Sequence, residues 1–253
     1  MTIRVEAIGD AVVLTIDRPE AKNALDRKVT KRLGEAIQIA TQDPSVRGIV
    51  LTAAGSDTFV SGGDLKEFKA LVDAPDGEQQ VLQMALGLGA CETCDVPVIA
   101  AVQGDTFGGG CELLLLCDLV ILERHASIAF RHAKMGLSPA WGGATRLVER
   151  VGPLQAARLL FTAEKIDAEE ALRVGLVSEI VDTGAARGRA IAMVNRIADN
   201  PRVSVAALKR ALREIRQARR GDAFVREGVI FAEMWGKPDH QRAMNEFLKK
   251  KRP

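Results

Sequence analysis

The stretch TFGGGCELLLLCD, residues 106–118, places three glycines just before one carboxylate, Glu112, and a run of leucines. Glycines ahead of a helix let the backbone approach a ligand closely, and the first N–H groups of a helix have no partner within it. The partial positive charge of a helix N-terminus adds to this preference for an anion. The stretch therefore predicts a helix start that stabilises a negative charge, either permanent or developing.

A nucleotide phosphate is the first such anion to consider, and the motifs argue against it. The chain has no G-x-x-x-x-G-K-[ST] string, and GDTFGGG, residues 104–110, lacks the G-x-G-x-x-G order of a dinucleotide site. A developing oxyanion fits better, because a second glycine loop, SGGD at 61–64, can supply another N–H donor. Glu112 follows in the first helical turn, where it can carry a proton for the same group. A structural role stays open here, with the glycines allowing close helix packing and Glu112 serving as a helix charge.

Strands and helices alternate along the chain to about residue 182. Apolar runs predict buried strands at 11–17, 46–53, 96–104 and 118–124. Helices are expected after Asp26 as N-cap, after Asp64, and over 78–93. The alternation predicts an α/β layer architecture with parallel strands. From Pro201 the pattern is purely helical, so we predict a core of residues 1–197 and a helical C-terminal region of residues 198–253.

Composition and cysteine spacing limit the class of protein. The 253 residues fit one large domain or a domain with a small appendage. The longest apolar run, LLLLCDLVIL, is short of the roughly 20 residues that span a bilayer. The N-terminus lacks the zones of a signal peptide, so a cytoplasmic protein is expected. CETC, residues 91–94, has the spacing of a redox or zinc half-site, but it lacks a second ligand pair and follows a helical pattern; we expect reduced structural thiols and no metal.

Charge is unevenly distributed along the chain. Residues 202–253 carry 14 Lys/Arg and 6 Asp/Glu, whereas the remaining 201 residues have a net charge of −6. A basic tail on an acidic body is typical of proteins that bind a phosphorylated ligand, a nucleic acid or an acidic subunit surface, although a solvated helix face gives the same count. A nucleic-acid binder would lose affinity steeply as salt rises. The tail has few aromatics and no recognisable RNA-binding module, so we expect neither a nucleic-acid nor a membrane partner.

Six stretches, in order and across nearly the whole chain, resemble the enoyl-CoA hydratase/isomerase (crotonase) family. They are IDRPEAKNALD (16–26), FVSGGDLKEF (59–68), PVIAAVQGDTFGGGCELLLLCD (97–118), MGLSPAWGGATRL (135–147), DAEEALRVGLVSEIV (167–181) and EFLKKKRP (246–253). The resemblance implies a spiral of ββα turns with a helical C-terminal region that assembles a homotrimer or hexamer. It also implies an acyl-CoA substrate, with no cofactor beyond the coenzyme A of the thioester.

The resemblance also assigns site residues. The backbone N–H groups of Gly63 and Gly109 correspond to the family's oxyanion hole, and Glu112 corresponds to its first glutamate. The candidates for binding CoA are Lys22, Ala24, Asp64, Leu65, Lys66, Phe247 and Lys250. The three lysines are candidates for the CoA phosphates, and surface solvation is the alternative for each. Lys250 belongs to a terminal helix that a neighbouring subunit can also supply, and apolar residues within 71–90 are expected to shape part of the acyl pocket.

One position departs from the family's hydratases. Their second glutamate lies seven residues before the proline of the following motif, and counting back from Pro139 in IAFRHAKMGLSPAWGG gives His132. That segment contains no carboxylate. Because an imidazole titrates near neutral pH, His132 is the candidate partner of Glu112, and Lys134 is a weaker alternative.

This departure bears on the expected reaction. The segment RHAKMGLSPAWGGATRLVERVG, residues 131–152, resembles most the branch that contains ethylmalonyl-CoA decarboxylases. Loss of CO₂ from a thioester needs two N–H donors and one proton source. The sequence therefore favours an acyl-CoA lyase that decarboxylates a short alkylmalonyl-CoA through a thioester enolate. A 2-enoyl-CoA hydratase or an enoyl-CoA isomerase of fatty-acid or acyl-CoA degradation is the alternative, and the intact Gly-Gly-Gly-x-Glu argues against an inactive scaffold subunit.

Overall fold

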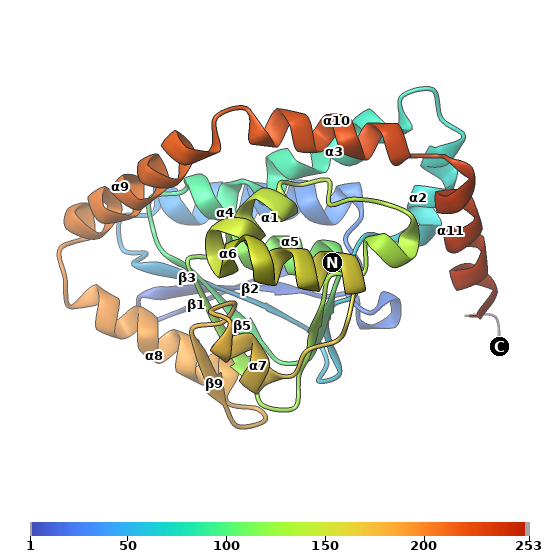
Figure 1. Cartoon of the computed structure of the whole chain (residues 1–253). Helices are drawn as coiled ribbons and strands as arrows, with labels where there is room; N and C mark the ends of the chain where they lie inside the picture. The colour runs from blue at the N-terminus through green and yellow to red at the C-terminus, as the bar shows by residue number, and fades with distance from the viewer. Residues whose placement is uncertain (1, 251–253) are drawn as a thin grey trace.

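The computed structural model describes residues 2–250, and a six-stranded sheet lies at its centre (Figure 1). The strand order is β1 (Ile3–Ile8), β2 (Ala11–Ile16), β3 (Gly48–Ala53), β5 (Val98–Val102), β7 (Leu119–Glu123) and β9 (Glu179–Val181). β1 and β2 form an antiparallel pair, and all other neighbours in this sheet are parallel. The predicted α/β architecture with parallel strands is confirmed.

A second, smaller sheet builds the site. It is parallel, with the order β4 (Thr58–Val60), β6 (Asp105–Phe107) and β8 (Ile128–Ala129). Each of its strands follows a strand of the large sheet after a short turn. Helices then follow two of them: α2 (Leu65–Val72) after β4, and α5 (Gly109–Leu116) after β6. The chain thus repeats a strand–strand–helix unit, which is the spiral of ββα turns that the resemblance implied.

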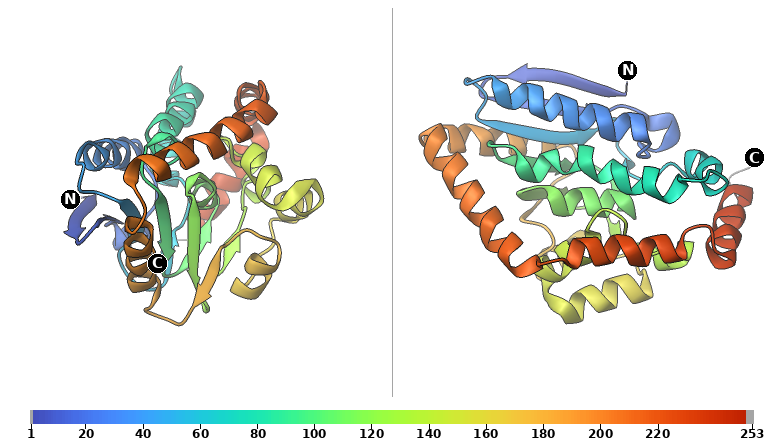
Figure 2. Two further views of the ribbon diagram at one scale, coloured as in Figure 1. Left: turned by 90° about the vertical axis from the view of Figure 1, so that its left-hand side faces the viewer. Right: turned by 90° about the horizontal axis from the view of Figure 1, so that it is seen from above.

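Helices cover both faces of the large sheet (Figures 1 and 2). One face carries α1 (Arg27–Gln42), α3 (Gly77–Leu88), α4 (Ala90–Thr93) and α5, whereas α8 (Ala186–Ala198) packs on the other. Val13, Val50 and Ile99 point toward α8, and their chain neighbours point toward the opposite core. Because strands covered on both faces bury every residue, they appear in the sequence as continuous apolar runs. Asp26 caps α1 as predicted, accepting from the Val29 N–H at 2.6 Å.

The remaining elements are short turns and the C-terminal helices. They are η1 (Pro19–Ala21), η2 (Ala133–Met135), α6 (Gly143–Thr162), α7 (Ala168–Arg173), α9 (Arg202–Arg220), α10 (Ala223–Met234) and α11 (Pro238–Lys250). α10 packs on α3 and α6, and α11 returns to pack on α2 and η2. Across residues 2–250, no helix is long and apolar enough to cross a membrane. The division of the chain at residues 197/198 stays a prediction.

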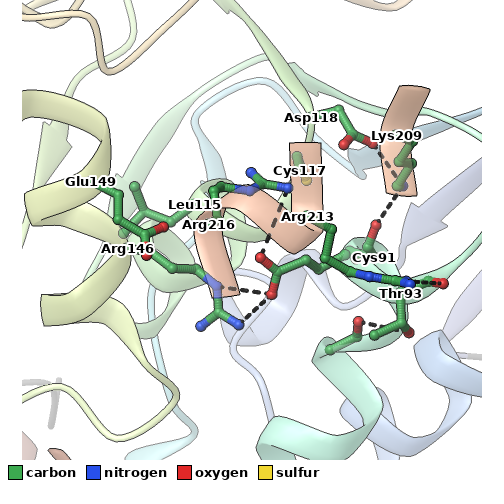
Figure 3. Close-up of polar contacts among 12 residues, drawn as sticks. Cys91, Thr93, Leu115, Cys117, Asp118, Arg146, Glu149, Lys209, Arg213 and Arg216 are labelled. Carbon is green, nitrogen blue, oxygen red and sulfur yellow. Dashed lines mark hydrogen bonds and ion pairs between the residues drawn. The ribbon is translucent and has the colours of Figure 1, made fainter. Parts of the chain in front are cut away.

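The basic residues of α9 meet polar groups of the core (Figure 3). Lys209 is buried, pairs with Asp118 at 2.7 Å and donates to the backbone carbonyls of Cys91 and Val96, at 2.9 Å each. The Cys94 thiol lies 3.4 Å from the ammonium group of Lys209, and burial raises the pKa of this thiol. Both thiols of the CETC segment are free, and they lie where α9 docks on the core.

A second cluster joins α4, α6 and α9. The buried Glu92 carboxylate accepts from Arg146 at 2.6 Å and from Arg220 at 2.8 Å, and Arg220 also pairs with Glu149. Burial alone raises the pKa of Glu92, but hydrogen bonds and charge from the two arginines outweigh it and hold the pKa at about 2. Some basic residues of the C-terminal region therefore form ion pairs with acidic residues of the same chain, which the charge count alone does not reveal.

Candidate active site

Two glycine loops lie against each other at the small sheet. Because β4 and β6 are neighbours, the loops that follow them emerge side by side. Gly62 and Gly108 have φ values of 110° and 52°, which only glycine adopts readily, and they turn each loop toward the other. A β-carbon at Gly62 would lie 3.6 Å from the backbone nitrogen of Gly109. The two loops singled out from the sequence are thus in contact.

The N–H groups of Gly63 and Gly109 have no hydrogen-bond acceptor within residues 2–250. Leu25 pairs with the residues on either side of Gly63, accepting from the Asp64 N–H and donating to the Gly62 carbonyl, both at 2.8 Å. This pairing leaves the Gly63 N–H directed away from Leu25. Gly109 is the first residue of α5, where a helix leaves its N–H groups unpaired. Such an arrangement can stabilise an oxyanion.

Among the residues that the structure describes, four donors surround the Glu112 carboxylate. One oxygen accepts from His132 Nε2 at 3.0 Å and from the Ala140 N–H at 3.4 Å. The other accepts from the N–H groups of Trp141 at 2.8 Å and Gly143 at 3.0 Å. A β-carbon at Gly143 would lie 2.6 Å from the carboxylate, so glycine is required for this close approach. The carboxylate is buried and fixed in orientation, beside the first turn of α6.

His132 lies beside Glu112, as the sequence predicted. Its Nε2 faces the carboxylate, whereas its Nδ1 is buried and has no hydrogen-bond partner in the described part of the chain. A neutral ring that donates from Nε2 leaves Nδ1 as an acceptor. Lys134 is exposed on η2, and among the described residues no hydrogen bond or ion pair joins it to Glu112. The geometry therefore pairs Glu112 with His132; the catalytic roles of the two stay predictions.

The candidate CoA segments are joined by a residue that the sequence did not single out, Arg18. Its guanidinium pairs with Asp26 and Asp64, both at 2.9 Å, and donates to the Ala24 carbonyl at 2.7 Å. Asp64 also caps α2 by accepting from the Lys66 N–H. The Asp64 side chain is thus engaged within the chain. The sequence signal that could have identified Arg18 is its position within IDRPEAKNALD, a stretch that also contains Asp26, one of its two acidic partners.

The other CoA candidates are distributed over neighbouring elements. Lys22 and Lys66 are exposed, and Leu65 is half-buried at the start of α2. Phe247 is exposed on α11, a helix that packs against α2. Lys250 ends α11, and its side chain lies outside what the structure describes. Their contact with CoA stays a prediction.

Two further residues shape the site and were missed. The buried indole of Trp141 donates to the Val81 carbonyl of α3 at 2.8 Å, and a β-carbon at Gly109 would lie 2.4 Å from the ring. Glu227 of α10 accepts from the N–H groups of Ala144 and Thr145, at 3.1 and 3.0 Å. Burial and the charge of Glu112 raise the pKa of Glu227. Neither contact has a sequence signature, because each depends on which element packs over the start of α6.

Comparison with known proteins bears on this geometry. Residues 7–253 match the model of the family described as enoyl-CoA hydratase/isomerase. The chain is 34% identical over 247 residues to a short-chain-enoyl-CoA hydratase of Clostridium acetobutylicum, a match that covers 98% of this chain and 94% of the relative. It is 32% identical over 240 residues to a crotonyl-CoA hydratase of Syntrophomonas wolfei, a match that covers 95% of this chain and 92% of the relative. The crystal structure of a carnitinyl-CoA hydratase from Mycobacterium avium superposes with a TM-score of 0.87 at 34% identity, covering 100% of this chain and 97% of that one. The chain belongs to the enoyl-CoA hydratase/isomerase family.

Proposed function

We propose that this protein catalyses the reversible addition of water to the double bond of a short-chain 2-enoyl-CoA. The observation that carries the proposal is the pair formed by the buried Glu112 and the half-buried His132, 3.0 Å apart, next to the N–H groups of Gly63 and Gly109, which have no acceptor among the described residues. The relatives named above are called hydratases, which favours hydration over the decarboxylation that the sequence suggested.

The proposed steps use only groups of this chain and the thioester. The carbonyl oxygen of the substrate accepts from the two glycine N–H groups, which stabilise the negative charge of the enolate; removal of one such donor typically costs about 3 kcal/mol. The oxygen of water bonds to C3, and a water proton passes to the Glu112–His132 pair. A proton then passes to C2, and the pair returns to its starting state.

An imidazole can replace the carboxylate that hydratases usually carry at this position. Hydration requires one group that accepts a proton from water and one that donates a proton to carbon. His132 donates to Glu112 through Nε2 and retains a second ring nitrogen, so the pair can hold a proton on either member. Their fixed geometry favours transfer within a single bound complex.

Decarboxylation of an alkylmalonyl-CoA is the second candidate. A glutamate at position 132 would repel the carboxylate of such a substrate, whereas His132 carries no negative charge. Assays side by side with crotonyl-CoA, a 3-enoyl-CoA and ethylmalonyl-CoA separate the reactions. We expect crotonyl-CoA to give the 3-hydroxy product with the highest kcat/KM of the three. Release of CO₂ from ethylmalonyl-CoA, with crotonyl-CoA unchanged, would identify a decarboxylase and overturn the proposal.

We also propose that copies of this chain associate through α9 and α10, as a homotrimer or hexamer. Leu208, Leu212 and Ile215 of α9 are each more than half exposed, and α10 adds Val229 and Ile230. The α9 residues recur at intervals of four and three, so they form one apolar stripe. A stripe of this kind marks an interface more often than a solvated surface.

The double variant L208K/L212K is expected to convert the assembly to monomers, because two buried lysines at an apolar interface would be unpaired. Light scattering coupled to size-exclusion chromatography measures the mass. The matched control is V5K, which places one lysine on the exposed edge strand β1 and is expected to leave the mass unchanged. A wild-type protein that elutes as a monomer at micromolar concentration would refute the association.

A further inference from the structure

A cavity of about 440 Å³, open to solvent on the side of the exposed Leu86, lies between α3 and the turn that joins α9 to α10, and Trp141 forms part of its wall. Ala85, Leu86 and Leu116 give the cavity an apolar side. Its charged side consists of Glu92 and the two arginines that pair with it, Arg146 and Arg220. Gly63, Gly109, Glu112 and His132 are not among its lining residues. These four residues therefore do not face the cavity, and Trp141 is the residue of the site that does.

Trp141 contacts both the site and the cavity. Its backbone N–H donates to Glu112 at 2.8 Å, and its ring lies so close to Gly109 that a β-carbon there would be 2.4 Å away. The indole N–H donates to the Val81 carbonyl at 2.8 Å, which holds the ring against α3. The residue is 4% exposed. Displacing the ring would break this hydrogen bond and leave a buried donor and acceptor unpaired.

We propose that Trp141 closes the end of the acyl pocket, that it restricts the enzyme to short acyl groups, and that the cavity behind it is the space a longer chain would occupy. This inference rests on the proposed function. Suppose that the thioester oxygen of the substrate lies at the Gly109 N–H and that the C2–C3 bond lies at Glu112. The next carbons of the acyl chain then approach Trp141, because Trp141 contacts both Gly109 and Glu112.

The cavity suits an alkyl chain once the ring is removed. The guanidinium groups of Arg146 and Arg220 are engaged by Glu92, so they present paired rather than free charge to the space. Ala85, Leu86 and Leu116 offer apolar surface, and burying methylene groups against such surface is favourable. One methylene in a pocket is typically worth a factor of about ten or more in kcat/KM, so the position of this wall decides chain length.

The test compares kcat/KM for crotonyl-CoA and for trans-2-octenoyl-CoA. Wild-type protein is expected to favour the four-carbon substrate by at least about tenfold. W141A is expected to reverse or remove that preference, whereas W141F keeps an aromatic wall and is expected to retain it. The double variant W141A/A85F refills the cavity from α3 and is expected to restore the preference for crotonyl-CoA.

Each outcome has one interpretation. Equal kcat/KM for the two substrates in wild-type protein would overturn the proposal without any variant. An unchanged ratio in a folded W141A, checked by circular dichroism and thermal melting, would do the same. If W141A does not fold, W141L at the same position supplies the ratio. If wild-type protein hydrates neither substrate, the proposed function fails instead.

Discussion

Replacement of Glu112 by Gln is expected to lower kcat for crotonyl-CoA by about 10² to 10⁴-fold, which is the range for loss of an acid–base group. The reason lies in its four hydrogen bonds. All four partners, His132 Nε2 and the N–H groups of Ala140, Trp141 and Gly143, donate to the carboxylate. A Gln side chain presents an NH₂ group to one pair of these donors. It therefore cannot accept the proton from water, and it loses the hydrogen bonds from that pair of donors.

Two further variants separate chemistry from folding. E112D keeps the charge but shortens the reach, and it is expected to retain more activity than E112Q. E35Q changes an exposed glutamate of α1 and is expected to match wild type in both kcat and melting temperature. Steady-state kinetics with crotonyl-CoA and melting curves for all four proteins provide the measurement. Full activity in E112Q would remove Glu112 from the mechanism.

The central strands were predictable because both of their faces are covered. Val50 and Leu51, adjacent in β3, belong to different apolar clusters, so the chain must be apolar at every position. The small sheet was not predicted, because β4, β6 and β8 have only two or three residues each and pair with strands far along the chain. Periodicity needs a longer segment than that to give a signal.

The glycine loops and Glu112 were predictable because their chemistry lies in residue type and spacing. The hydrogen bonds that hold the Glu112 carboxylate were not predictable, because three of the four donors are backbone N–H groups, which every residue except proline has. The basic tail was also ambiguous, since a charge count does not say that Lys209 meets Asp118. Decarboxylation and hydration both stay predictions: His132 favoured the first, whereas relatives that match almost all of the chain are named hydratases.

Removal of the Glu92 carboxylate is expected to have the largest effect on stability. Glu92 lies between Arg146 and Arg220, and all three side chains are less than a tenth exposed. E92A would leave two buried guanidinium groups without their shared partner, and breaking a buried pair in this way typically costs about 3–5 kcal/mol of unfolding free energy. Urea unfolding at pH 7, compared with E35Q, measures the difference. A change below about 1 kcal/mol would show that the arginines find other partners.

Acid titration of the same group provides an independent check with a defined sign. The arginines hold the pKa of Glu92 at about 2 in the folded protein, below its ordinary value of 4.5. A depressed pKa stabilises the fold above pH 4.5, and that stabilisation is lost as the pH falls from 4.5 toward 2. The shift corresponds to about 3 kcal/mol. Wild-type protein should therefore lose this amount relative to E92Q over that interval, because the amide introduced by the substitution does not titrate; parallel pH profiles of the two proteins would mean that the Glu92–arginine cluster does not form in solution.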